Sequence, residues 1–176
     1  MLFRSVGHDL EEGNVPAVEA EKGRKTFASV EEAIKRKTVL ACHDISEGGL
    51  AVALAEMCFA GSIGADVELQ NIPHSKPFFE KAQIESARLG PVAAATWGLS
   101  KNGDEIALFS ESQTRFIVEV AYEKESEFET IMKKQACPYG KIGKTKGKKL
   151  LITGNGRIID ADIHELKEAW QKPLRW

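Results

Sequence analysis

The fold depends on residues 38–69, which read TVLACHDISEGGLAVALAEMCFAGSIGADVEL. Residues 38–42 form a short, partly β-branched run without charge, which predicts a buried strand. Residues 50–60 form a longer run rich in Ala and Leu, which predicts a helix. Residues 43–49 join the two as a polar corner that contains adjacent glycines. We expect the rest of the chain to be organised around this strand and helix.

The polar corner has a functional and a structural interpretation. Ser46 is placed to cap the helix, and Gly48 and Gly49 in its first turn would let a ligand approach the backbone without meeting a Cβ. Free amides and the positive end of the helix dipole favour an anion at such a turn. Alternatively, the glycines only permit a tight turn, which His43 and Asp44 fix by hydrogen bonds. Spacing alone favours this structural interpretation.

A second polar block lies between two runs that predict strands, residues 105–109 and 115–120. The block consists of Ser110, Glu111, Ser112 and Gln113. Its carboxylate, hydroxyls and amide could hold ribose hydroxyls, phosphate or a magnesium-bound water. The alternative is a polar turn whose side chains bond to its own backbone.

Outside these blocks, hydrophobic spacing predicts several further elements. Helices are expected within residues 20–37, 78–89 and 123–135, and a half-buried strand at 65–69. The segment around Gly154-Asn155-Gly156 predicts a hairpin, and Asp162 with Glu165 resembles a capping box that opens a last helix. Alternating hairpins and crossovers predict a mixed β-sheet covered by helices, an α+β fold shading to α/β.

Length and composition predict one domain. The chain has 176 residues, of which 43% are hydrophobic and 28% charged, enough to build one substantial core. Residues 1–20 carry little apolar periodicity and are expected to be a linker, which leaves residues 21–176 as the single domain.

Charge and cysteine content exclude several classes of protein. A net charge of −2 gives no broad surface for nucleic acid or an anionic membrane, and no run is long enough to span a bilayer. Cys42, Cys58 and Cys137 are odd in number and widely spaced, as expected of reduced core thiols in a cytoplasmic protein. No Cys-x-x-Cys pair, paired histidines or nucleophile with an adjacent base appears, so we expect neither a metal site nor a catalytic residue.

Three stretches resemble a known family. They are HDISEGGLAVALAEM at 43–57 with GADVEL at 64–69, LFSESQTRF at 108–116, and the closing residues 142–170. Together they resemble the last domain of the large subunit of phosphoribosylformylglycinamidine synthase, a domain type shared with aminoimidazole ribonucleotide synthetase. Glu47 departs from the family, which commonly has Asp there.

The resemblance implies a role in a ligase of purine biosynthesis. That enzyme makes formylglycinamidine ribonucleotide from formylglycinamide ribonucleotide, ATP, Mg²⁺ and glutamine-derived ammonia, and its ATP and magnesium ligands lie in other domains. The expected partners are the ATP-binding domain of the same enzyme, a glutaminase subunit and a small accessory subunit.

The resemblance also favours the functional interpretation of both polar blocks. It implies a substrate-binding or nucleotide-binding role for His43, Asp44, Ser46, Gly48, Gly49, Glu111, Ser112 and Gln113. Because the chain resembles the second of two pseudo-equivalent halves, an auxiliary nucleotide site or a structural site is favoured over the substrate site.

Two other functions stay open from the sequence. The chain could be the C-terminal domain of another enzyme of the same superfamily, although the residue sequence of the two polar blocks argues against this. It could also be a free-standing interaction module without catalysis, which the absence of an upstream ATP-binding domain from the same gene would favour.

Overall fold

The structure is a computed structural model that describes residues 18–73, 102–154 and 156–175. Its α-helices are α2 (Ala20–Lys35), α3 (Gly49–Gly61), α6 (Asn102–Phe109), α7 (Glu125–Lys134) and α8 (Ile163–Gln171). Its strands are β1 (Val39–Asp44), β2 (Ala65–Glu68), β3 (Phe116–Val120), β4 (Gly143–Thr145), β5 (Lys149–Gly154) and β6 (Gly156–Asp162). Three short 3₁₀ turns, η1 (Leu69–Asn71), η2 (Tyr122–Lys124) and η3 (Lys172–Leu174), complete the described elements. The helix expected at 78–89 lies outside these residues.

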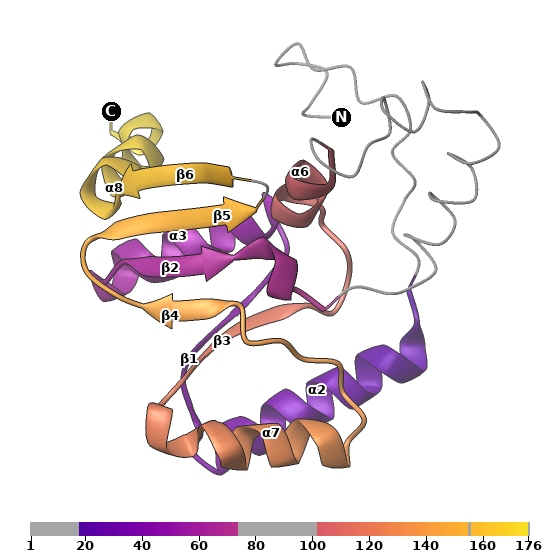
Figure 1. The fold of residues 1–176 in the computed structure, drawn as a ribbon. Coiled ribbons are helices and arrows are strands. Elements are labelled where there is room, and N and C mark those ends of the chain that lie inside the picture. Colours follow the sequence, from indigo (N-terminus) through magenta and orange to yellow (C-terminus); the bar gives the residue numbers. More distant parts are fainter. Residues whose placement is uncertain (1–17, 74–101, 155, 176) are drawn as a thin grey trace, which may run out of the picture.

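The described strands form two sheets (Figure 1). One sheet has the order β4-β2-β5-β6, with β2 and β5 parallel and the outer pairs antiparallel. The other is an antiparallel pair of β1 and β3, in which His43 lies opposite Ile117. The α+β prediction is therefore confirmed, with two sheets in place of a single mixed one.

Helix α3 lies at the centre of the main core, behind the four-stranded sheet in Figure 1. It is apolar almost all round, which is typical of a helix that is buried on every side. Leu50, Ala53 and Leu54 are each at most 5% exposed, and they pack in one cluster with Leu150 and other strand residues. Helices α6 and α8 contact α3 directly.

A second, smaller core lies between α2 and α7, which run side by side below the sheets (Figure 1). Its buried members are Ala33, Ile131, Met132 and Cys137. Both helices are amphipathic and carry their charges on the outer face, where α2 forms pairs such as Arg36 with Glu32.

Two expected strands differ from the structure. Residues 105–109 are part of helix α6, because Leu108 is buried against α3 and the acidic residues Asp104 and Glu105 occupy a favourable first turn. Strand β1 is half exposed rather than buried: its residues alternate, and Leu40 is 65% exposed. Cys42 shares the exposed face, so the expectation of a core thiol there was wrong, whereas Cys58 and Cys137 are buried.

The hairpin of β5 and β6 and the cap of α8 confirm the prediction for the C-terminal part. The Asp162 carboxylate accepts hydrogen bonds from the amides of His164 at 2.8 Å and Glu165 at 3.4 Å. Strand β4 was not expected, because its residues are all exposed and carry no apolar alternation.

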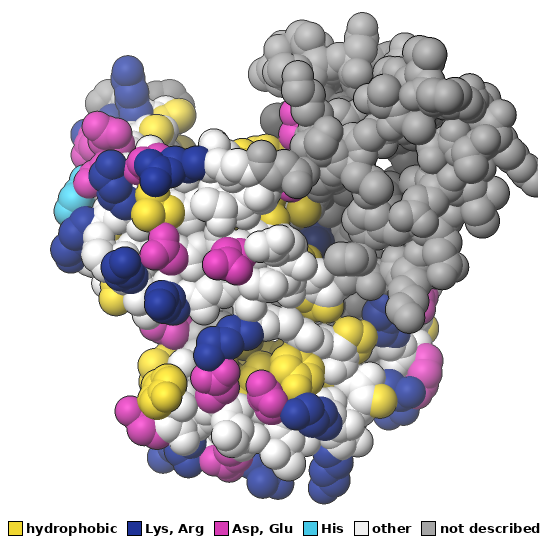
Figure 2. Space-filling view, viewed as in Figure 1, with side chains coloured by type: hydrophobic (Ala, Val, Ile, Leu, Met, Phe, Trp, Pro, Cys, Tyr) yellow, Lys and Arg dark blue, Asp and Glu magenta, His cyan; other side chains and the backbone are white. Residues whose placement is uncertain are grey.

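The surface mixes both signs of charge, as Figure 2 shows for one face. Lysines of the segment 141–149 pair with acids of other elements, among them Lys141 with Glu125 at 2.6 Å and Lys149 with Asp160 at 2.9 Å. These pairs agree with a solvated surface. None of the helices in the described part of the chain combines the length and hydropathy needed to span a bilayer.

Candidate functional site

The corner between β1 and α3 turns through two left-handed glycines. Gly48 has φ +75° and Gly49 has φ +69°, a backbone conformation that other residues adopt only at a cost. Gly48 is the N-cap of α3, and no side chain caps the helix there. The expectation that Ser46 caps the helix was therefore wrong: its hydroxyl instead donates to Asp44 Oδ2 at 2.7 Å.

The structure brings the two predicted polar blocks together. The Gly48 amide donates to Glu111 Oε1 at 2.8 Å, across 63 residues of sequence. The carboxylate of Glu111 thus lies where an anion would bind at the start of α3. Any external anion at this amide has to replace a negative charge that is already in place.

Gly49 has a packing role that the sequence did not reveal. A Cβ on Gly49 would lie 2.6 Å from the carbonyl oxygen of Leu108 and 2.7 Å from Cα of Phe109. The start of α3 therefore lies directly against the backbone at the end of α6. This contact supports the structural interpretation for Gly49, whereas the Gly48 amide is directed at the second polar block.

Arg115 is a site residue that sequence reasoning missed. Its guanidinium donates to the carbonyl and hydroxyl oxygens of Ser110, the latter at 3.1 Å, and to the carbonyl of Ser112 at 3.4 Å. Burial lowers the pKa of Arg115. The Arg115 carbonyl accepts from the Ile45 amide at 2.9 Å, so this residue holds both polar blocks. Its position two residues after the second block was the available signal.

Ser112 and Gln113 contribute less than expected. Ser112 offers its carbonyl to Arg115, and the Gln113 carbonyl accepts from the Thr114 hydroxyl at 2.8 Å. Gln113 is exposed and Ser112 half-buried. Within the described part of the chain, neither side chain makes a hydrogen bond to residues 45–49, which we call the glycine corner.

Asp44 and Ser46 form a small acidic unit at the end of β1. The hydrogen bond from Ser46 lowers the pKa of Asp44, and the Asp44 backbone amide and the neighbouring His43 lower it further. Asp44 is exposed, so its carboxylate stays charged and accessible beside the glycine corner.

His43 faces away from the glycine corner toward α3. Its Nε2 lies 2.8 Å from Glu56 Oε2, and its Nδ1 lies 2.6 Å from the carbonyl oxygen of Asp44. The second oxygen of Glu56 accepts from the indole Nε1 of Trp170 at 3.1 Å. The structure therefore places His43 in a hydrogen-bond network with α3 and α8 and not beside Glu111.

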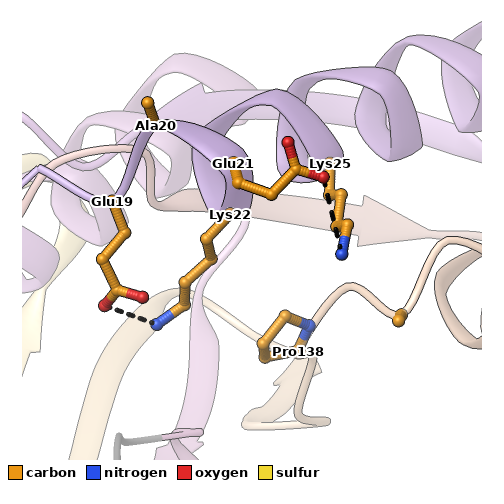
Figure 3. Close-up of a pocket in the computed structure, with 7 residues that line it drawn as sticks. Glu19, Ala20, Glu21, Lys22, Lys25 and Pro138 are labelled. Atoms are coloured by element: carbon orange, nitrogen blue, oxygen red, sulfur yellow. Dashed lines mark ion pairs between the residues drawn. The ribbon is translucent and has the colours of Figure 1, made fainter.

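Two pockets lie away from these polar blocks, along α2 and α7. The first, of about 440 Å³, is lined by Glu19, Ala20, Glu21, Lys22, Lys25, Ala136 and Pro138 (Figure 3). Its acids and lysines pair with each other, Lys22 with Glu19 at 3.5 Å and Lys25 with Glu21 at 3.7 Å, so the pocket does not favour an ion of either sign. The second, of about 380 Å³, lies between α2 and α7 and includes Ile131.

The described residues do not supply a metal site. Among them, no three His, Cys, Asp or Glu side chains gather closely enough to hold a metal ion. Of the acids at the glycine corner, Asp44 and Glu111 are each held by a donor from the protein, Ser46 and the Gly48 amide respectively.

The corner between β1 and α3, with the polar loop between α6 and β3 beside it, is part of an α+β domain that belongs to a known family. The chain is a member of the family described as AIR synthase related protein, C-terminal domain, whose model matches residues 1–153. It is 32% identical over 175 residues to the phosphoribosylformylglycinamidine synthase subunit PurL of Caldanaerobacter subterraneus, and 32% identical over 172 residues to that of Thermomicrobium roseum. These alignments cover 99% and 98% of this chain but only 20% of each relative. The chain therefore spans about a fifth of the length of the curated relatives it matches.

Solved structures share the fold. The Thermotoga maritima PurL complexed with FGAR aligns with a TM-score of 0.65 at 19% identity, over 92% of this chain and 23% of that one. The hydrogenase maturation protein HypE in complex with ATP aligns with a TM-score of 0.54 at 14% identity, over 77% of this chain and 39% of that one. These two likenesses show the fold, and the family model confirms the expected domain type.

Proposed function

We propose that this chain acts as the C-terminal domain of the large subunit of phosphoribosylformylglycinamidine synthase. One observation carries the proposal: the match to PurL subunits runs through 99% of this chain at 32% identity. The fold shared with T. maritima PurL supports it. The domain would act as a scaffold and would present a face for phosphate or nucleotide.

In the proposed parent enzyme, ATP activates the amide oxygen of formylglycinamide ribonucleotide so that ammonia can displace phosphate. Such a reaction depends on positioning and on neutralising charge around the phosphates. The resemblance to this enzyme implies that the magnesium ligands belong to other domains. A solved structure named PurLQS from Thermotoga maritima supports further subunits as partners of the parent enzyme, and we propose that these are a glutaminase subunit and a small accessory subunit.

The ligand face would lie at the glycine corner beside Asp44 and Glu111. Because Glu111 occupies the Gly48 amide, an incoming phosphate would compete with its carboxylate. Phosphate or a non-hydrolysable ATP analogue is therefore expected to shift the amide resonances of residues 46–50 more strongly in Glu111→Gln than in the parent chain. Glu68→Gln, which changes an exposed acid bonded to Asn71, is the control. No shift at residues 46–50 in Glu111→Gln would remove the ligand role of this face, and equal shifts in all three proteins would mean that the ligand does not compete with Glu111.

Activity measurements test the function as a whole. The chain alone should fold but release no ADP when given formylglycinamide ribonucleotide, ATP, Mg²⁺ and ammonia. Addition of the separately expressed upstream domains should restore ADP release. Turnover by the chain alone would place the chemistry here instead, and no turnover on mixing with domains that bind the chain would argue for a different enzyme or for an interaction module.

A further inference from the structure

The ring of His43 has a hydrogen-bond acceptor at each nitrogen. Nδ1 lies 2.6 Å from the carbonyl oxygen of Asp44, and Nε2 lies 2.8 Å from Glu56 Oε2. A carbonyl oxygen cannot donate, and neither can an ionised carboxylate. A neutral imidazole carries one N–H and would leave one lone pair facing an oxygen lone pair, so the cation is the form that satisfies both contacts.

Glu56 extends this contact to the C-terminal helix. It lies on the otherwise apolar helix α3 with 28% of its side chain exposed. Its second oxygen accepts the Trp170 indole N–H at 3.1 Å, and the Trp170 ring packs against Phe59 with centroids 5.6 Å apart. One half-buried carboxylate thereby joins β1, α3 and α8.

The same contact fixes the start of the glycine corner. The Asp44 carbonyl that receives His43 Nδ1 belongs to the last residue of β1, and residues 45–49 follow it directly. The charged groups that act on the ring are Glu56 from α3 and Asp44 from β1, whose Oδ1 lies 3.5 Å from Nδ1. Strand β3 places the uncharged Ile117 opposite His43, and α8 contributes the uncharged indole.

We propose that His43, Glu56 and Trp170 form a protonation-dependent latch between the glycine corner and helix α8. When His43 is a cation, Glu56 is held by both donors and the end of β1 is tied to α3. When the ring loses a proton, one of its two contacts becomes a repulsion between lone pairs, and the corner is released from α3 while the Trp170 contact adjusts. The latch is independent of the function proposed above.

The pH range follows from the balance at His43. Burial opposes the charged ring, but the hydrogen bonds to the Asp44 carbonyl and Glu56, with the charges of Glu56 and Asp44, outweigh it and raise the pKa of His43 above 6.5. A group whose pKa is raised by folding stabilises the fold fully below its unfolded pKa, and this contribution is lost as pH rises through the folded value. The latch is therefore closed in mild acid and opens as pH rises above that raised value.

An NMR titration of the 176-residue chain tests the latch. The His43 ring resonances, the Trp170 indole N–H and the amides of residues 45–49 should all titrate with one shared midpoint. Glu56→Gln should lower the His43 midpoint, because the attracting charge is removed while the shape is kept. Glu129→Gln, which removes an exposed charge paired with Lys133 on α7, should leave the midpoint unchanged.

Trp170→Phe keeps an aromatic ring against Phe59 and leaves the His43–Glu56 contact intact. It is therefore the second test variant if Glu56→Gln fails to fold. In this variant the corner amides should still follow His43, and the Trp170 indole resonance is lost by design. The latch is overturned if the Trp170 indole or the corner amides show no step at the His43 midpoint in the parent chain. It is equally overturned if Glu56→Gln leaves that midpoint in place.

Discussion

Gly48 and Gly49 share a left-handed backbone but differ in what surrounds them. A Cβ on Gly48 would meet the side chain of Val52, with Cγ2 at 2.4 Å, and a valine side chain can change rotamer. A Cβ on Gly49 would meet the backbone of Leu108 and Phe109, which cannot move without shifting helix α6. At the scale of single residues, Gly49 therefore sets the distance between two helices, and Gly48 sets the direction of one amide.

Gly49→Ala should destabilise the chain by about 1 to 3 kcal/mol more than Gly147→Ala, the typical cost of overpacking. The comparison isolates packing, because Gly147 has a similar φ of +63° and nothing within 4 Å of a Cβ. Both positions have a left-handed φ, so both variants carry a similar backbone strain. Urea unfolding measures the difference, and equal losses would mean that the start of α3 does not press on α6.

At the scale of elements, the sequence predicted those with a long or regular pattern. The strand and helix around the glycine corner, the helices α2 and α7, and the β5-β6 hairpin follow from periodicity and turn residues. Residues 105–109 were misread because a run of five with three large apolar side chains does not separate strand from helix. The missing signal was the partner of Leu108, which is α3 and lies far away in sequence.

The sequence indicated the two polar blocks of the candidate site, but neither Arg115 nor the contacts between the blocks. That the two polar blocks meet through Gly48 and Glu111 depends on the pairing of β1 with β3, which no local pattern fixes. For the same reason the sequence could not reveal that Glu56 accepts hydrogen bonds from His43 and Trp170. The cap of α3 was misassigned because the helix begins at Gly49 with Gly48 as its N-cap, which leaves Ser46 two residues before the capping position.

Leu54→Ala should cost about 2 to 5 kcal/mol in free energy of unfolding, as truncation of a buried leucine usually does. Leu54 is 5% exposed and lies in the cluster that joins α3 to both sheets. Lys146→Ala removes an exposed contact with Asp66 at 3.6 Å and should cost less than about 1 kcal/mol. Chemical denaturation of both variants decides this, and similar small losses would contradict the central packing of α3.

At the scale of the whole molecule, the residues that the structure describes form two hydrophobic cores of unequal size. The main core surrounds α3 and includes strands of both sheets, whereas the smaller one has four buried residues between α2 and α7. Proteins open in cooperative units whose free energies follow their buried contacts. We therefore expect α2 and α7 to open together without disrupting the main core, at a lower free energy than α3.

Hydrogen exchange under native conditions tests this order of opening through two variants. Leu54→Ala lowers the free energy of only those openings in which the main core is lost. It should therefore lower the protection of α3 amides and leave that of α2 and α7 amides unchanged. Met132→Ala destabilises the native state relative to both kinds of opening, because Met132 is 2% exposed in the smaller core, so it should lower protection in all three helices. Both truncations should cost about 2 to 5 kcal/mol where they act. If Leu54→Ala lowered the protection of α2 and α7 as much as that of α3, the two cores would unfold as one cooperative unit.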